Sequence, residues 1–135
     1  MANEPTYSML LYFKKNPKIT HEEFKDYYEN VHAPRIMEIT QSAKGLIAYT
    51  RQYINHDHSD AATSNPFVAF GSPVPEIPFD IVNAVTFQTK ADAVEFSRMM
   101  YEDEENSVKI LKDENYLFVR SQSRGVVVDK SVSIG

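Results

Sequence analysis

The chain has 135 residues, a formal net charge of -5 and 42% hydrophobic residues, which is typical of one soluble globular domain that buries a real core. It has no cysteine, and this excludes disulfides, thiolate zinc sites and cysteine nucleophiles. Its lysines and arginines are scattered along an acidic chain, so we expect no nucleic-acid partner. No apolar run is long enough for a membrane span and no signal-peptide pattern is visible, so we expect no membrane partner and a cytoplasmic location.

The first predicted element is a buried strand over residues 7–13, which are apolar on both faces. The turn signal Asn16-Pro17 follows it. A helix comes next, because Thr20 and Glu23 have the spacing of a capping box, in which each side chain satisfies a backbone donor of the first turn.

This helix carries the most informative pattern of the chain. Phe24, Tyr28 and His32 follow one another at steps of four, so they form one aromatic stripe that ends in an imidazole. Pro34 lacks a backbone donor and disfavours the α conformation at Ala33, which predicts a kink or break with unpaired carbonyls near the imidazole. We expect a histidine of perturbed pKa at the mouth of an apolar pocket, although the pattern also fits a core helix with a polar tip.

Helical spacing continues over residues 33–43, and Gly45 is a plausible C-cap. Residues 46–56 alternate as a second strand. The segment at about 57–79 has four prolines and no periodicity, so we expect a loop that acts as a lid or a dimer arm.

A third strand is predicted over residues 80–87, and Thr89 then caps a helix that extends to about Tyr101. One or two further helical turns reach Leu111, and a final strand covers residues 125–128. The order strand-helix-strand-strand-helix-strand predicts a single α+β domain over residues 1–135. We expect a ferredoxin-like fold with a four-stranded antiparallel sheet and two helices on one face.

The open face of such a sheet would expose apolar side chains, so we expect a homodimer that covers it. The eight tyrosines and eight phenylalanines suit a pocket for a flat aromatic small molecule. His32 is the expected general acid/base, with Tyr28 and the sheet residue Tyr49 stabilising an enolate oxygen. The expected substrate-binding side chains are Tyr12, Arg51, Tyr53, Asp80, Asn83 and Tyr116.

We expect neither a metal nor a cofactor. His56 and His58 flank Asp57 with a spacing that can hold a metal, but no third ligand has a recognisable spacing. His21, in the first turn of a helix, is expected to be a surface residue.

The helix motif resembles that of the EthD-domain family, and it reads Phe24-x-x-Tyr27-Tyr28-x-x-x-His32-Ala33-Pro34. The resemblance extends to Phe79-Asp80, to the passage from Phe87 to Ala93 and to Asp113-Glu114-Asn115-Tyr116. It implies a dimeric α+β barrel. Size and the proline-rich middle are most similar to small fungal polyketide-pathway enzymes, some of them decarboxylases of anthrone-type acids. That subgroup often has Asp-His-Glu where this chain has Asp113-Glu114-Asn115.

The expected function is therefore that of a cofactor-free acid/base enzyme on an aromatic or polyketide-derived keto/enol substrate, with a decarboxylating lyase first. A cofactor-independent monooxygenase and a polyketide cyclase or isomerase are alternative functions, because their reactions pass through the same enolate. A non-catalytic binding protein for an apolar aromatic metabolite predicts affinity without turnover. A structural dimer whose loop recruits another enzyme is the remaining alternative.

Overall fold

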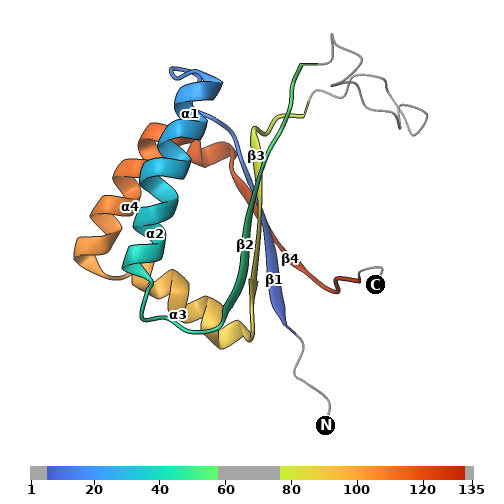
Figure 1. Cartoon of the computed structure of the whole chain (residues 1–135), viewed down its shortest axis with the longest axis vertical. Helices are drawn as coiled ribbons and strands as arrows, with labels where there is room; N and C mark the ends of the chain where they lie inside the picture. Colours follow the sequence, from blue (N-terminus) through green and yellow to red (C-terminus); the bar gives the residue numbers. More distant parts are fainter. Residues whose placement is uncertain (1–5, 58–76, 133–135) are drawn as a thin grey trace.

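The computed structural model describes residues 6–57 and 77–132, so the expected lid or dimer arm lies almost entirely outside the described residues. Figure 1 shows a twisted sheet with the helices gathered on one of its faces. The elements in chain order are β1 (Tyr7–Phe13), α1 (His21–Tyr27), the π turn η1 (Tyr28–His32), α2 (Ala33–Ile39), β2 (Leu46–Tyr53), β3 (Ile81–Phe87), α3 (Lys90–Tyr101), α4 (Glu104–Leu117), the short η3 (Arg120–Gln122) and β4 (Arg124–Val128).

The sheet has the order β2-β3-β1-β4, and every neighbouring pair is antiparallel. This confirms the ferredoxin-like fold. Side chains alternate along each strand, so Leu11 and its partner Asn83 face the helices, while Leu10 and its partner Ala84 face the opposite side. The sheet therefore has one covered face and one open face.

The predicted break at Pro34 is wrong, because the chain stays helical from α1 through η1 into α2. Ala33 keeps an α conformation, with φ of -62° and ψ of -45°, and its N–H donates to the carbonyl of Tyr28 across the π turn. Pro34 lies in the first turn of α2, where the absence of a backbone donor costs little.

The π turn keeps one stripe of side chains against the core. In a regular α-helix each step of four residues overshoots a full turn by about 40°, so a long stripe at that spacing drifts off its face. A π turn has wider i→i+5 bonds and takes up this drift. Phe24, Tyr28, His32 and Ile36 accordingly all stay buried, with exposed fractions of 1%, 1%, 3% and 4%.

The second half of the helical layer is longer than predicted, since α4 continues past Leu111 to Leu117. Its buried residues are Ile110, Asp113, Glu114 and Leu117, which have the spacing of one helical face. Two carboxylates therefore lie on the side of α4 that packs inward.

The helix predicted to end near Gly45 ends earlier, at Ile39, where the Thr40 hydroxyl donates to the carbonyl of Ile36. Gly45 instead leads into β2 with φ of +91°. A Cβ atom here would lie 2.2 Å from Oδ2 of Asp92, so both the backbone and the neighbour require glycine.

We expect Gly45→Ala to lower the free energy of unfolding by about 1–2 kcal/mol through left-handed strain alone, with a further loss from displacing Asp92. Gly125→Ala is the comparison, because its added Cβ meets only Leu11 Cδ2, at 3.1 Å. Urea unfolding of both variants measures the difference. A loss at Gly45 no larger than that at Gly125 would contradict this reasoning.

Candidate active site

A cavity of about 410 Å³ lies between the helices and the covered face of the sheet. This is a common size for a small-molecule pocket, roughly 300–1,000 Å³. Its apolar lining comes from both layers and comprises Met9, Leu11, Phe13, Ile36, Val85, Phe87, Ala93, Phe96, Met100 and Phe118. Its polar side chains are Tyr28, His32, Tyr49, Asn83, Ser97, Tyr101, Glu114, Ser123 and Arg124.

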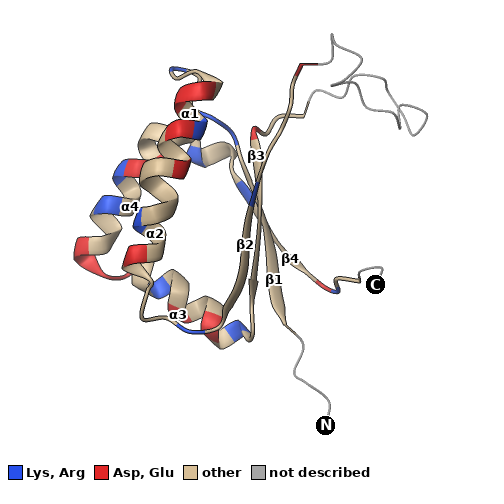
Figure 2. Cartoon of the chain, in the orientation of Figure 1, with Lys and Arg blue, Asp and Glu red and all other residues tan. Residues whose placement is uncertain are grey.

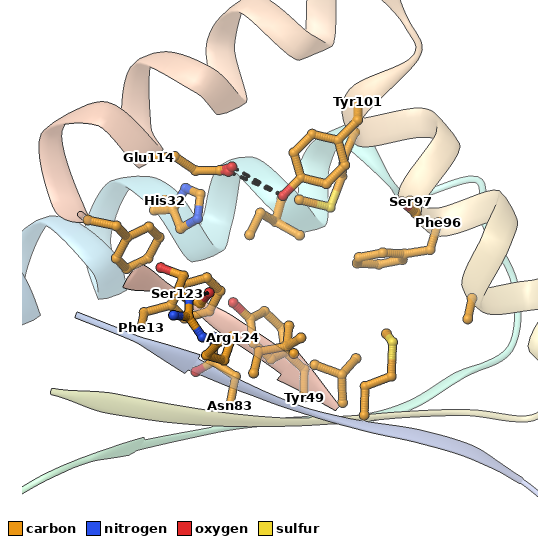
Figure 3. Close-up of a pocket in the computed structure, with 18 of the residues that line it drawn as sticks. Phe13, His32, Tyr49, Asn83, Phe96, Ser97, Tyr101, Glu114, Ser123 and Arg124 are labelled. Atoms are coloured by element: carbon orange, nitrogen blue, oxygen red, sulfur yellow. Dashed lines mark hydrogen bonds between the residues drawn. The ribbon is translucent and has the colours of Figure 1, made fainter. Parts of the chain in front are cut away.

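The polar groups divide between two sides. In Figure 3, His32, Tyr101 and Glu114 extend from the helices, and Tyr49 and Asn83 rise from the sheet on the other side of the cavity. We call the first set the helical side and the second set the sheet side. A flat ligand between them would meet hydrogen-bonding groups on both of its faces or edges.

His32 is fixed by a carboxylate from α4. Its Nδ1 lies 3.0 Å from Oδ2 of Asp113, whose other oxygen accepts from the Tyr27 hydroxyl at 2.7 Å and from Arg35 at 2.6 Å. A carboxylate can only accept, so Nδ1 of His32 carries the hydrogen. No hydrogen-bond partner for Nε2 is found in the part of the chain that the structure describes, so Nε2 is available to a ligand.

The protonation state of His32 follows from its burial. Burial lowers the pKa of His32 from its ordinary 6.5, an effect that Asp113 opposes and Arg35 reinforces. The imidazole is therefore neutral at neutral pH, with a lone pair on Nε2. A neutral imidazole held in one tautomer is suited to act as a general base.

The sheet side meets the helical layer in a chain of three hydrogen-bonding groups, because Tyr28 belongs to η1. Nδ2 of Asn83 donates to the Tyr28 hydroxyl at 2.7 Å, and the Tyr28 and Tyr49 hydroxyl oxygens lie 2.6 Å apart. When the Tyr28 hydroxyl is the donor in this hydrogen bond, the hydroxyl hydrogen of Tyr49 is left to donate to a ligand. The chain thus orients a phenolic donor.

Tyr49 keeps its proton near neutral pH, because burial raises the pKa of its phenol to about 12. The Arg51 guanidinium lies 4.9 Å from the centre of the Tyr49 ring and opposes that rise. A phenol beside a cation is a good donor to a developing oxyanion.

Glu114 is the second ionisable group of the helical side and is only 7% exposed. Each of its oxygens lies 3.2 Å from the Tyr101 hydroxyl, and Nε of Arg120 lies 3.9 Å away. Burial raises the pKa of the Glu114 carboxyl above its usual 4.5, against the opposing effects of Arg120 and Tyr101.

The structure brings four of the predicted site residues together at the cavity: His32, Tyr28, Tyr49 and Asn83. Arg51 and Tyr53 do not line it. Arg51 makes two hydrogen bonds to the Glu29 carboxylate, of 2.7 and 2.6 Å, and the Tyr53 hydroxyl makes a third of 2.6 Å. Both side chains are held by the Glu29 carboxylate of η1, and the alternating pattern of β2 could not indicate this contact.

Tyr12, Asp80 and Tyr116 also lie outside the cavity lining. Tyr12 falls on the open face of β1, because the alternation of the strand sends it opposite to Leu11. Asp80 precedes β3, and its carboxylate accepts from the backbone N–H of Lys15 at 2.7 Å. Tyr116 packs its ring against that of Tyr27, with centroids 4.4 Å apart.

Sequence reasoning did not assign roles to Asp113, Glu114 and Tyr101. The available signal was the spacing from Ile110 to Leu117, which places both carboxylates on one apolar helical face. It was overlooked because the helix was expected to end near Leu111.

The His56 ring contacts a carboxylate: Nε2 of His56 lies 3.0 Å from Oδ1 of Asp80. Across residues 6–57 and 77–132, no group of three or more metal-binding side chains is found, and His58 lies outside those ranges. Within the same described parts, no helix is long and apolar enough to cross a membrane.

Fold and cavity together define an α+β ferredoxin-like domain with an aromatic pocket lined by ionisable side chains. Residues 16–121, most of the chain, match the EthD domain, so the chain belongs to the EthD-domain family. A comparison with curated proteins finds no match.

Solved structures share the fold at low identity. An ethyl tert-butyl ether D (EthD) family protein from Bacillus halodurans is 17% identical with a TM-score of 0.53, and the match covers 93% of this chain and 99% of that one. A mutant of SnoaB, a cofactor-independent oxygenase from Streptomyces nogalater, is 7% identical with a TM-score of 0.57 and 98% coverage of both chains. A dimeric ferredoxin-like protein of unknown function from Thermobifida fusca is 7% identical with a TM-score of 0.52, covering 91% of this chain and 89% of that one.

The raised pKa of Glu114 predicts how stability depends on pH. The folded protein binds this proton more tightly than the unfolded chain, so the stabilisation present below about pH 4.5 is lost as pH rises through the folded-state pKa. Glu114→Gln does not titrate. We therefore expect its free energy of unfolding, relative to wild type, to increase from about pH 4.5 to 8 in urea denaturation. A pH-independent difference would contradict the raised pKa.

Proposed function

We propose that this chain is an enzyme that transfers protons to and from an aromatic, polyketide-type keto or enol compound without a coenzyme. The observation that carries the proposal is a neutral His32, held by Asp113 at an apolar cavity that also holds the Tyr28–Tyr49 phenol pair. The Tyr28 ring packs edge-on against the His32 ring, with centroids 5.0 Å apart. Such substrates form stabilised anions. General acid–base catalysis, worth about 10²–10⁴-fold, and orientation then suffice for turnover.

In the proposed reaction the lone pair of His32 Nε2 removes an acidic proton next to a carbonyl group. The negative charge that develops on the carbonyl oxygen is stabilised by the hydroxyl of Tyr49, which the hydrogen bond from Tyr28 orients. The apolar lining excludes water and so strengthens both interactions. We propose a decarboxylating lyase first, because a β-keto or anthrone-type carboxylic acid breaks down through this same enolate.

Oxygenation is the rival reaction, since the same carbanion can react with dioxygen in an apolar cavity. The SnoaB structure, described as a cofactor-independent oxygenase, shares the fold with this chain. The purified protein should be incubated with aromatic β-keto acids and anthrones, with and without oxygen, and the products followed by mass. Loss of carbon dioxide without oxygen supports the lyase, and an oxygen-dependent mass gain supports the oxygenase. Binding without any mass change or isomer formation would favour a binding protein.

His32→Ala should reduce turnover of the responding substrate by about 10²–10⁴-fold, because it removes the general base. The fold and oligomeric state should be retained, as judged by circular dichroism and light scattering. His21→Ala is the control, since His21 is exposed in the first turn of α1. Unchanged turnover in His32→Ala would remove this role.

We also propose that two copies of the chain pair through the open face of the sheet. The helices cover only one face (Figure 1), and β1 and β3 carry no charged residue, as Figure 2 shows. Leu10, Tyr12, Val82 and Ala84 lie together on the open face. A contiguous apolar surface of this kind favours association. The Thermobifida fusca protein with the same fold is described as dimeric.

Leu10→Arg should convert the proposed dimer into a monomer, because it places a charge at the centre of the open face. Val108→Arg is a matched control on α4, where the side chain is already 66% exposed. Light scattering at micromolar concentration distinguishes the two. A monomeric wild-type protein, or a Leu10→Arg variant that stays dimeric, would defeat this interface.

A further inference from the structure

Glu114 has the setting of a carboxylic acid that gives up a proton inside the cavity. It lies on the inward face of α4, and its carboxyl group extends into the same space as the His32 ring, as Figure 3 shows. Its hydrogen-bond partner is the Tyr101 hydroxyl of α3, at 3.2 Å from both oxygens. One side chain of the cavity wall therefore holds the carboxyl group in place without neutralising it.

The neighbouring Asp113 provides a built-in contrast. Asp113 is fully buried and accepts hydrogen bonds from His32, from Tyr27 and from the Arg35 guanidinium. Glu114 has the single phenol and a guanidinium at 3.9 Å. Adjacent residues of one helix thus hold two carboxyl groups in opposite surroundings, the usual arrangement when two carboxyls have different proton-transfer roles.

Several charged or titratable groups face Glu114. Tyr101 of α3, Arg120 of η3 and Asp113 of α4 act on it directly. His32 of η1 and Arg124 of β4 line the same cavity. His32 is neutral near neutral pH, so Arg120 and Arg124 are the facing positive charges. The Arg120 contact is long, and Arg124 donates to the carbonyls of Ser121 and Ser123.

We propose that Glu114 is the catalytic acid that protonates the carbon atom of the enolate, on the side of the cavity opposite Tyr49. This deepens, and rests on, the proposed function. In decarboxylation, the bond between the α-carbon and the carboxylate breaks, carbon dioxide leaves, and the electron pair forms the enolate. Glu114 then gives its proton to the α-carbon as the ketone re-forms, and its carboxylate regains a proton from water. Protonation converts the α-carbon of the enolate into a C–H group, so this carbon does not react with dioxygen.

The test uses α-methyl benzoylacetate in deuterium oxide and scores only the monodeuterated propiophenone, in which decarboxylation has added one deuterium at a prochiral carbon. Delivery by Glu114 from one face gives wild-type product enriched in one enantiomer. Glu114→Gln has nearly the same shape but no transferable acidic proton, so its product should be racemic. Glu114→Asp should recover part of the enrichment. A variant with only a structural defect would slow the reaction and leave the enantiomeric excess unchanged.

Glu105→Gln on the exposed side of α4 is the matched control and should keep the wild-type enantiomeric excess. Retained enrichment in Glu114→Gln, or racemic wild-type product, overturns the inference while leaving the proposed decarboxylation intact. Infrared spectroscopy gives a readout independent of turnover: the wild type should show a protonated-carboxyl band near neutral pH that Glu114→Gln lacks. Absence of this band overturns the inference. If the band is present but wild type accelerates no probe reaction, the proposed function has failed and the assigned acid role fails with it.

Discussion

The buried carboxylate of Asp113 is the interaction on which the site depends. It joins α4 to η1 through His32, to α1 through Tyr27 and to α2 through Arg35. Without this carboxylate, the His32 N–H, the Tyr27 hydroxyl and the Arg35 guanidinium would all lose a shared buried acceptor. The orientation of the imidazole and the packing of the helical layer are therefore set by the same group, and neither can change alone.

The cavity lies between this helical side, which is organised by a carboxylate, and a sheet side, which is organised by neutral hydrogen-bonding groups. Asn83 of the sheet and Tyr28 of η1 form a hydrogen-bonded chain with the phenol of Tyr49, and apolar side chains line the cavity beside it. Burial favours the neutral forms of three ionisable groups at the cavity, His32, Tyr49 and Glu114. Neutral donors and acceptors at these three positions suit a substrate that brings or develops its own negative charge.

Local sequence patterns predicted one half of this site well. The capping box at Thr20 and the steps from Phe24 to Tyr28 to His32 depend on neighbours within a few residues, so the helix and its aromatic stripe could be inferred from the chain alone. The order of strands and helices along the chain followed from the same reasoning at the level of whole elements. The geometry at Pro34 could not be inferred, because a proline after a π turn and a proline that ends a helix look alike in sequence.

The other half depends on contacts between residues far apart in the chain. Asp113 pairs with His32 across 81 positions. Arg51 shares a face of β2 with Tyr49, yet it is drawn to Glu29 of η1, and only the packed helix shows that this carboxylate is within reach. Side-chain type and spacing indicate which residues can carry chemistry. Which of them meet is decided by the packing of helices on the sheet.

The π turn has a consequence for chain length. It behaves as one extra residue inserted into an otherwise regular helix, and each residue rotates an α-helix by about 100°. A one-residue deletion between Tyr28 and His32 would let this segment close as a regular α-helix, in which Phe24 and His32, then seven residues apart, still lie within about 20° of one face. The aromatic stripe and its imidazole are therefore compatible with two lengths of this helix, one with a π turn and one that is a regular α-helix one residue shorter, so helix length alone does not distinguish chains that carry such a site from chains that carry only the scaffold.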